Sequence, residues 1–246
     1  MCMRSRQHFL MSVLTVLPFL LVLFFTGTEL YLLLLFLAAV ILGAMLPDAD
    51  ADGTPALYHK AKWLYYTLRW FVIKPVVIFF RLFVRSKHDV EDLHRGIMHA
   101  PIGILISSIF VCKILILILY LLGALSWLIV GIFFVGVFIG QIMHLLEDSL
   151  TPGGINWAFP FGDAKLSGRI YTHDLGKSAK RHDIRPFFFS TILLSINLGV
   201  IFLYSVELSK QIPFIYVLIP LAILLLLAWI FIFAIAKTES ELWKLG

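Results

Sequence analysis

Charged residues are scarce in this chain. Asp, Glu, Lys and Arg make up 14% of the 246 residues, against roughly 25% in ordinary soluble proteins. Only two cysteines are present, Cys2 and Cys112, which excludes a disulfide framework. Apolar residues account for 61% and gather in long runs that a water-soluble globule could not bury. The solvent for most of this chain is therefore lipid.

The sequence also lacks the common nucleotide-binding and export signals. It contains no Walker-type phosphate loop and no dinucleotide fingerprint. The first 25 residues resemble a signal peptide, but no small-x-small cleavage site follows and a second apolar run begins at once. We therefore expect a retained first span.

Six apolar runs are long enough, at about 1.5 Å per helical residue, to cross a bilayer core of about 30 Å. The first two and the middle two are joined so closely that they predict helical hairpins. The runs cover residues 9–25, 30–46, 100–122, 124–146, 187–206 and 213–236. The predicted fold is an all-α polytopic membrane protein, formed as one integral membrane domain over residues 1–246. Its parts are a four-helix core (1–162), a basic cytoplasmic loop (163–186) and a C-terminal helical pair (187–246).

Residues 57–87 fit neither a span nor a solvated loop. They interleave Lys and Arg with Trp and Tyr, the residues that favour the membrane interface. This mixture is typical of an amphipathic helix lying in the headgroup layer, here bent at Pro75. The alternative is a surface helix without lipid specificity.

The positive charge is strongly one-sided. All Lys and Arg residues except Lys113 and Lys210 fall on the side that carries the N-terminus, the loops 47–99 and 147–186 and the C-terminus. The positive-inside rule makes this side cytoplasmic. We therefore expect an inner-membrane protein with both termini in the cytoplasm.

Ionisable residues at the ends of four predicted spans gather on that same side. Such residues are costly near a bilayer and usually functional. His144 and Asp148 are four residues apart and so share one helix face. Imidazole with carboxylate suits Zn, Mn or Fe better than an all-oxygen Ca site, and the candidates are numerous enough for one or two ions. The candidate metal ligands are His8, Asp48, Asp50, His94, His99, His144 and Asp148.

Each motif also has a structural interpretation. His8 could be an interfacial residue, LPDADAD a solvated loop, and HRGIMHAP a helix cap with Arg95 facing lipid. His144 and Asp148 are harder to explain in this way, because burying such groups without partners costs several kcal/mol. All these helix ends share one side, which favours a common metal site.

The chain resembles the inner-membrane YdjM-like family of metal-dependent hydrolases over residues 5–162. That family has a His before the first span, LPDxDH after the second, HRGxTHS before the third, and HxxxDxxTxxG with a Pro-aromatic stretch after the fourth. Here Ala51 replaces the family His, with Asp52 as a substitute ligand, and Met98 and Ala100 replace the usual Thr and Ser. The matching positions are His8, Asp48, Asp50, His94, Arg95, Gly96, His99, His144, Asp148, Thr151 and Gly154.

The resemblance implies metal-dependent hydrolysis. The ligand types are also similar to those of zinc-dependent phospholipases, which predicts attack of an activated water on a phosphoester at the cytoplasmic interface. The expected substrate is an anionic or phosphorylated membrane lipid or a lipid-linked molecule, with no nucleic acid as partner. Asp50, Arg95 and Thr151 are the expected catalytic residues, with Arg95 neutralising phosphate oxygens unless it snorkels to headgroups.

Other functions remain open at this point. The basic loop could place His173 and Asp174 over the site as a lid, or could simply bind anionic headgroups. A non-catalytic metal-binding protein or a transporter is the main alternative, although a transporter needs ionisable residues near the midplane, where only Lys113 lies. A di-iron lipid hydroxylase or desaturase is disfavoured, because the eight His residues form neither HxxxH nor HxxHH.

Overall fold

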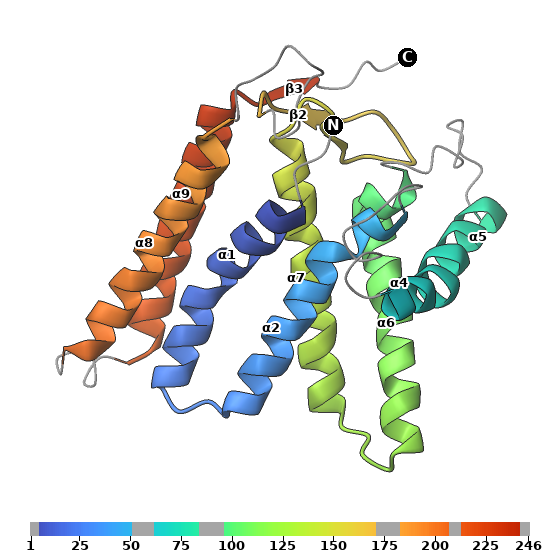
Figure 1. The fold of residues 1–246 in the computed structure, drawn as a ribbon, viewed down its shortest axis with the longest axis horizontal. Helices are drawn as coiled ribbons and strands as arrows, with labels where there is room; N and C mark the ends of the chain where they lie inside the picture. Colours follow the sequence, from blue (N-terminus) through green and yellow to red (C-terminus); the bar gives the residue numbers. More distant parts are fainter. Residues whose placement is uncertain (1–4, 51–61, 84–95, 171–182, 207–212, 242–246) are drawn as a thin grey trace.

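A computed structural model describes residues 5–50, 62–83, 96–170, 183–206 and 213–241 (Figure 1). Among these residues, six helical segments are long and apolar enough to cross a membrane, which confirms the predicted all-α polytopic class. These segments are Gln7–Phe25, Lys62–Leu82, Pro101–Leu121, Trp127–Ser149, Arg185–Ser205 and Ile215–Ala236. The helices at the six predicted spans are α1 (Ser5–Phe25), α2 (Leu30–Met45), α6 (Pro101–Leu121), α7 (Trp127–Ser149), α8 (Arg185–Ser205) and α9 (Ile215–Ala236). The two sets differ: α2 has 16 residues and is shorter than the segments above, whereas Lys62–Leu82 was not predicted as a span.

The predicted hairpins are α1–α2 and α6–α7, and α2 packs along α7 between them (Figure 1). The backbones of α2 and α7 touch, because glycine leaves no side chain in the way. A Cβ on Gly140 would lie 2.1 Å from the carbonyl oxygen of Val40, and a Cβ on Gly43 would lie 2.1 Å from that of Val137. Gly140 is one helical turn before His144, so this α2–α7 seam leads directly to the predicted ligands.

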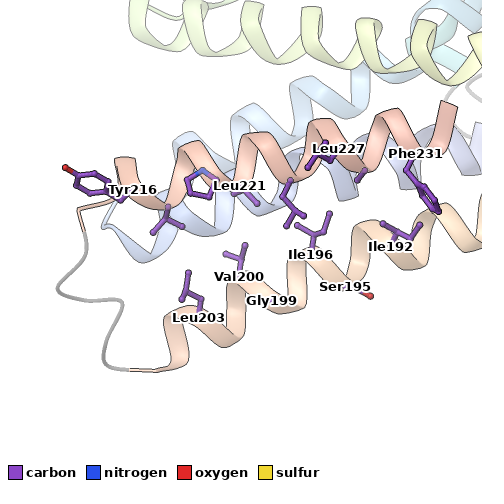
Figure 2. Close-up of a pocket in the computed structure, with 14 residues that line it drawn as sticks. Ile192, Ser195, Ile196, Gly199, Val200, Leu203, Tyr216, Leu221, Leu227 and Phe231 are labelled. Atoms are coloured by element: carbon purple, nitrogen blue, oxygen red, sulfur yellow. The ribbon is translucent and has the colours of Figure 1, made fainter. Parts of the chain in front are cut away.

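The C-terminal pair, α8 and α9, packs against α1 on the other side of the bundle (Figure 1). Between these two helices lies a groove of about 840 Å³, lined mainly by apolar side chains such as Ile196, Val200 and Leu221 (Figure 2). Gly199 also lines the groove, and a Cβ built there meets no atom within 4 Å. The α8–α9 pair is therefore much more loosely packed than the α2–α7 seam.

A small antiparallel sheet was not predicted. Its strands are β1 (Ile155–Asn156), β2 (Lys165–Ser167) and β3 (Glu239–Glu241), in the order β1-β2-β3. Leu166 on β2 pairs with both Ile155 and Ser240. The sheet thus joins the segment after α7 to the segment after α9, and β2 takes up part of the predicted basic loop.

Between α2 and α6 the chain forms α4 (Lys62–Leu68), a π-helical turn η2 (Arg69–Ile73) and α5 (Lys74–Phe83). The π turn directly precedes Pro75, which has no N–H to donate to the preceding turn and whose ring crowds it. In the π turn the N–H of Lys74 instead donates to the carbonyl of Arg69. The irregularity predicted at Pro75 therefore takes the form of a widened turn.

The turns that precede and follow the segment α4–η2–α5 lie on the same side of the bundle. The turn η1 (Pro47–Asp50) precedes it and the turn η3 (Ile97–His99) follows it, and these two turns contact each other. Twelve residues, 84–95, separate α5 from Gly96. A return crossing by these residues would have to be helical to satisfy their backbone groups in lipid, and as a helix they would extend only about 18 Å, less than the roughly 30 Å of a bilayer core. This favours the predicted interfacial placement over a seventh crossing.

Candidate metal centre

Five of the predicted metal ligands come together at one end of the bundle. Four of them are almost fully buried, whereas the side chain of Asp48 keeps 19% of its surface exposed. They come from four separate elements: His8 from α1, Asp48 from η1, His99 from η3, and His144 and Asp148 from α7. Pro101 starts α6 immediately after η3, as expected for a proline in the first helical turn.

Four of these side chains surround one point. His144 Nε2 lies 3.5 Å from Asp48 Oδ1 and 4.0 Å from Asp148 Oδ2. His99 Nε2 lies 3.8 Å and 3.9 Å from the same two oxygens. These separations are long for hydrogen bonds, but two ligands bound tetrahedrally at about 2.1 Å from one ion stand about 3.4 Å apart. The group therefore fits a metal ion.

His8 extends the cluster on its other side. Its Nε2 lies 3.4 Å from Asp148 Oδ1, and its ring stacks on that of His144 with centroids 4.1 Å apart. Asp148 thus presents Oδ1 towards His8 and Oδ2 towards His99 and His144. Two groups of potential ligands result, each with its ligand atoms within 4.8 Å of one another: His8, His144 and Asp148, and Asp48, His99 and His144.

A backbone carbonyl fixes the orientation of His144. Its Nδ1 lies 2.8 Å from the carbonyl oxygen of Ala44 on α2. Because a carbonyl only accepts hydrogen bonds, Nδ1 carries a proton, and Nε2 is the nitrogen directed towards the cluster. The close α2–α7 seam makes this contact possible.

Glu147 is a functional candidate that the sequence reasoning missed. It is fully buried; its Oε2 lies 2.7 Å from His8 Nδ1, and its Oε1 accepts a hydrogen bond of 2.9 Å from the Ser12 hydroxyl. A carboxylate on the outer nitrogen of a histidine ligand orients the ring and makes it more basic. The signal was available, because Glu147 is three residues after His144 and so lies near its face of α7.

The ligands outside the spanning helices have protonation states that suit a cation. Burial alone would raise the pKa of Asp48, but the surrounding imidazoles, that of His144 above all, hold this pKa well below its usual range. Burial lowers the pKa of His99, the nearby His144 adds to this, and together they outweigh the neighbouring carboxylates, which raise it. Near neutral pH, Asp48 is therefore ionised and His99 neutral, the forms that bind metal.

The remaining predicted residues are placed differently. The Thr151 hydroxyl donates to the backbone carbonyl of Asp148 at 2.8 Å, so it stabilises the end of α7. Asp50 ends η1, and its side chain lies outside the described part of the structure. Four further predicted residues lie entirely outside the described part: His94, Arg95, His173 and Asp174. So do Ala51 and Asp52, the two positions at which the LPDxDH motif is altered.

An uncharged polar network lies one turn below the cluster and joins α6 to α7. The Gln141 Oε1 accepts a hydrogen bond of 2.7 Å from Ser107, and Nε2 donates to Ser108 at 2.7 Å and to the Ile104 carbonyl at 3.2 Å. All three side chains are fully buried. The network therefore holds the helix that follows His99 against the helix that carries His144.

The comparisons with known proteins identify the family. The family model described as YdjM inner membrane protein matches residues 3–238, nearly the whole chain. Neither the curated proteins nor the solved structures contain a match. The resemblance predicted from the motifs is thus confirmed and extends to the C-terminal pair. The chain belongs to the YdjM family of inner membrane proteins, and it carries buried His and Asp groups that could hold a metal ion.

Proposed function

We propose that this protein is a membrane-embedded, metal-dependent hydrolase that cleaves a phosphoester in a lipid or lipid-linked substrate on the cytoplasmic side. The observation that carries the proposal is the cluster of three imidazoles and two carboxylates at metal-ligand spacing. The Ala44 carbonyl orients the His144 ring and Glu147 orients the His8 ring from outside the cluster. Such outer partners are typical of histidines that bind metal.

Zinc is the proposed metal, with Mn or Fe as alternatives, because the donors are nitrogen and oxygen atoms. A divalent ion bound here would lower the pKa of a water molecule and neutralise charge on phosphate oxygens. The two oxygens of Asp148 face opposite sides of the cluster, an arrangement that supports two ions bridged by this carboxylate. Glu147 would keep His8 in place by accepting its Nδ1 proton in a hydrogen bond.

A lipid-derived substrate is favoured by where the cluster lies. It occupies the end of an apolar bundle, and Asp48 is the ligand that keeps some exposure, so the polar group of a substrate would reach the cluster beside η1. Arg95, in the HRGIMHAP motif, is the proposed cation for phosphate oxygens. The cytoplasmic assignment is supported by the one-sided distribution of Lys and Arg.

The main alternative is a metal-binding protein without catalysis, including a transporter. Transport of an ion needs ionisable groups inside the bilayer, near its midplane. Among the described residues of α6, Lys113 is the charged one, and it is exposed on the outer surface beside Phe110 rather than directed into the bundle. This placement favours an enzyme over a transporter.

Metal analysis and lipid hydrolysis by the purified protein test the proposal. We expect bound metal and release of phosphate or headgroup from phosphatidic acid, other phospholipids or polyprenyl phosphates. His144→Ala and Asp148→Asn should each abolish both, since one removes a ligand nitrogen and the other the ligand charge. Asp163→Asn, an exposed carboxylate beside the sheet, is the matched control and should leave both intact. Metal and activity that survive both site substitutions would refute the proposal, and metal without hydrolysis of any of these lipids would favour the alternative.

A further inference from the structure

The outer face of α4–η2–α5 combines exposed aromatic rings with positive charge. Trp63, Trp70 and Phe71 are 73%, 60% and 63% exposed. Lys74 is also exposed, and its Nζ lies 3.2 Å from the centre of the Trp70 ring. Lys62 and Arg81 add further exposed cations, and residues 62–83 contain no acidic side chain. We call this surface the basic-aromatic face.

The opposite face of the same segment packs on the turns that carry two candidate ligands. Its buried side chains form one hydrophobic cluster with residues that flank Asp48 and His99. The segment contributes Tyr65, Leu68, Val72, Ile73, Val76 and Phe80, and the turns contribute Leu46, Ala49, Ile97, Met98 and Ala100. A shift of the segment would therefore move both turns.

The segment also lies at the correct level to meet lipid headgroups. The turns η1 and η3 on either side of it in the chain belong to the candidate metal centre, and it runs obliquely beside the upper half of α6 in Figure 1 rather than parallel to the crossing helices. Trp with Lys or Arg at this level is typical of the boundary between headgroups and acyl chains.

We propose that the basic-aromatic face binds the headgroups of anionic phospholipids in the leaflet next to the candidate metal centre. Charge complementarity selects the occupant: a face with several cations and no acids attracts an anionic surface, while its rings enter the boundary with the acyl chains. Through the inner hydrophobic cluster, this contact holds η1 and η3 in the arrangement that brings Asp48 to His99. This second step rests on the proposed metal site, whereas the lipid contact does not.

Tryptophan quenching by brominated lipids tests the lipid contact without metal or activity. The protein contains six Trp residues. The fluorescence of Trp63 and Trp70 on the basic-aromatic face is therefore obtained as the difference between the natural protein and the Trp63→Phe/Trp70→Phe variant. In nanodiscs at equal lipid content, we expect a brominated anionic phospholipid to quench this signal at least twofold more than a brominated zwitterionic one. The preference should weaken in high salt, because salt screens exposed charges.

Charge-removal variants show which surface is responsible. Lys74→Gln/Arg81→Gln should abolish the anionic preference, whereas Lys165→Gln/Lys237→Gln, which removes the same charge from exposed sites elsewhere, should retain it. Equal quenching by both lipids, or an equal loss in the control pair, would overturn the proposal. Stronger quenching by bromine at the chain ends than near the carbonyls would also overturn it, since that result means a spanning helix.

The link to the metal site is measured separately. Metal titration of the natural protein should show a severalfold higher affinity in nanodiscs with anionic lipid than in zwitterionic ones, and Lys74→Gln/Arg81→Gln should lose this difference. If quenching shows the lipid preference but metal affinity does not change with lipid, the coupling is wrong. If the protein binds no metal in either lipid, the proposed function fails while the quenching result stands.

Discussion

The α2–α7 seam and the α8–α9 pair are built from the same kinds of apolar residue, yet they pack in opposite ways. In the seam, Gly43 and Gly140 bring the two backbones into contact. In the pair, Gly199 faces open space in a groove of about 840 Å³ (Figure 2). Gly43 and Gly140 therefore allow close packing of α2 on α7, whereas Gly199 has no such role in the described part of the α8–α9 pair.

The difference follows the position of the candidate ligands. The α2–α7 seam ends at His144, and every described candidate ligand lies on α1, α7 or the turns beside them, whereas α8 and α9 carry none. A metal ion requires ligand positions fixed to within a few tenths of an ångström, so the helices that hold it need closely fixed spacing. The α8–α9 pair has no such requirement, and a loosely packed groove is tolerated there.

The largest expected effect comes from filling the seam. Gly140→Ala places a methyl group 2.1 Å from the Val40 carbonyl oxygen, so α2 and α7 must separate and the Ala44 contact to His144 must lengthen. We expect loss of metal binding and a fall in Tm of about 3–10 °C, from an overpacking cost of roughly 1–3 kcal/mol. Thermal unfolding and metal analysis of the purified variant measure both.

The matched control is Gly199→Ala in α8. No atom lies within 4 Å of its new methyl group, so Tm should change by less than about 2 °C and metal content should not change. Similar behaviour of the two variants would remove the distinction between the two regions.

A smaller effect is expected at Glu147, which tests whether ligand orientation matters beyond helix packing. Glu147→Gln keeps the size of the side chain but removes the charge beside His8 Nδ1. Metal affinity should fall about 10–100-fold, the usual effect of losing such an outer partner. Glu239→Gln, an exposed carboxylate paired with Arg169 on the sheet, is the control and should bind metal normally. Unchanged affinity in Glu147→Gln would show that this pair serves packing alone.

The smallest effect is expected from two buried amides, Gln141 on α7 of the seam and Asn197 on α8 of the pair. Gln141→Leu and Asn197→Leu each remove polar contacts between helices, worth about 0.6–1.7 kcal/mol in membrane proteins. Asn197 donates to the Leu14 carbonyl at 2.9 Å, an oxygen without its usual helical donor because that donor position is Pro18. Both variants should lose similar stability, but only Gln141→Leu should weaken metal binding. A loss of metal affinity in Asn197→Leu would mean that the C-terminal pair also supports the site.

Much of this architecture is predictable from local sequence. Long apolar runs locate the crossing helices, and the four motifs include each of the five ligands that converge, because in a helical bundle the ends of adjacent spans on one side must be neighbours. The exact spacing is not predictable in this way. The seam between Gly140 and Val40 depends on the register of α2 against α7, which no local pattern specifies.

Other features escaped prediction for identifiable reasons. The sheet joins Leu166 to Ile155 and Ser240 through strands of two or three residues, too short for an alternating pattern to be visible. Glu147 was hidden beside Asp148, because attention to the four-residue spacing from His144 left the three-residue spacing unused. The π turn before Pro75 depends on how the chain adapts to a proline, for which a bend is the simpler expectation.

The contact between His8 and Glu147 also constrains the order in which the protein is made. The two residues are 139 positions apart. At a translation rate of about 5–20 residues per second, the first helix waits roughly 7–28 s for its partner to leave the ribosome. Throughout that time His8 lacks the carboxylates of Glu147 and Asp148 that it contacts in the folded protein. Biogenesis of the protein therefore includes a stage at which its first helix is in place but cannot yet dock, and the arrival of α7 ends that stage.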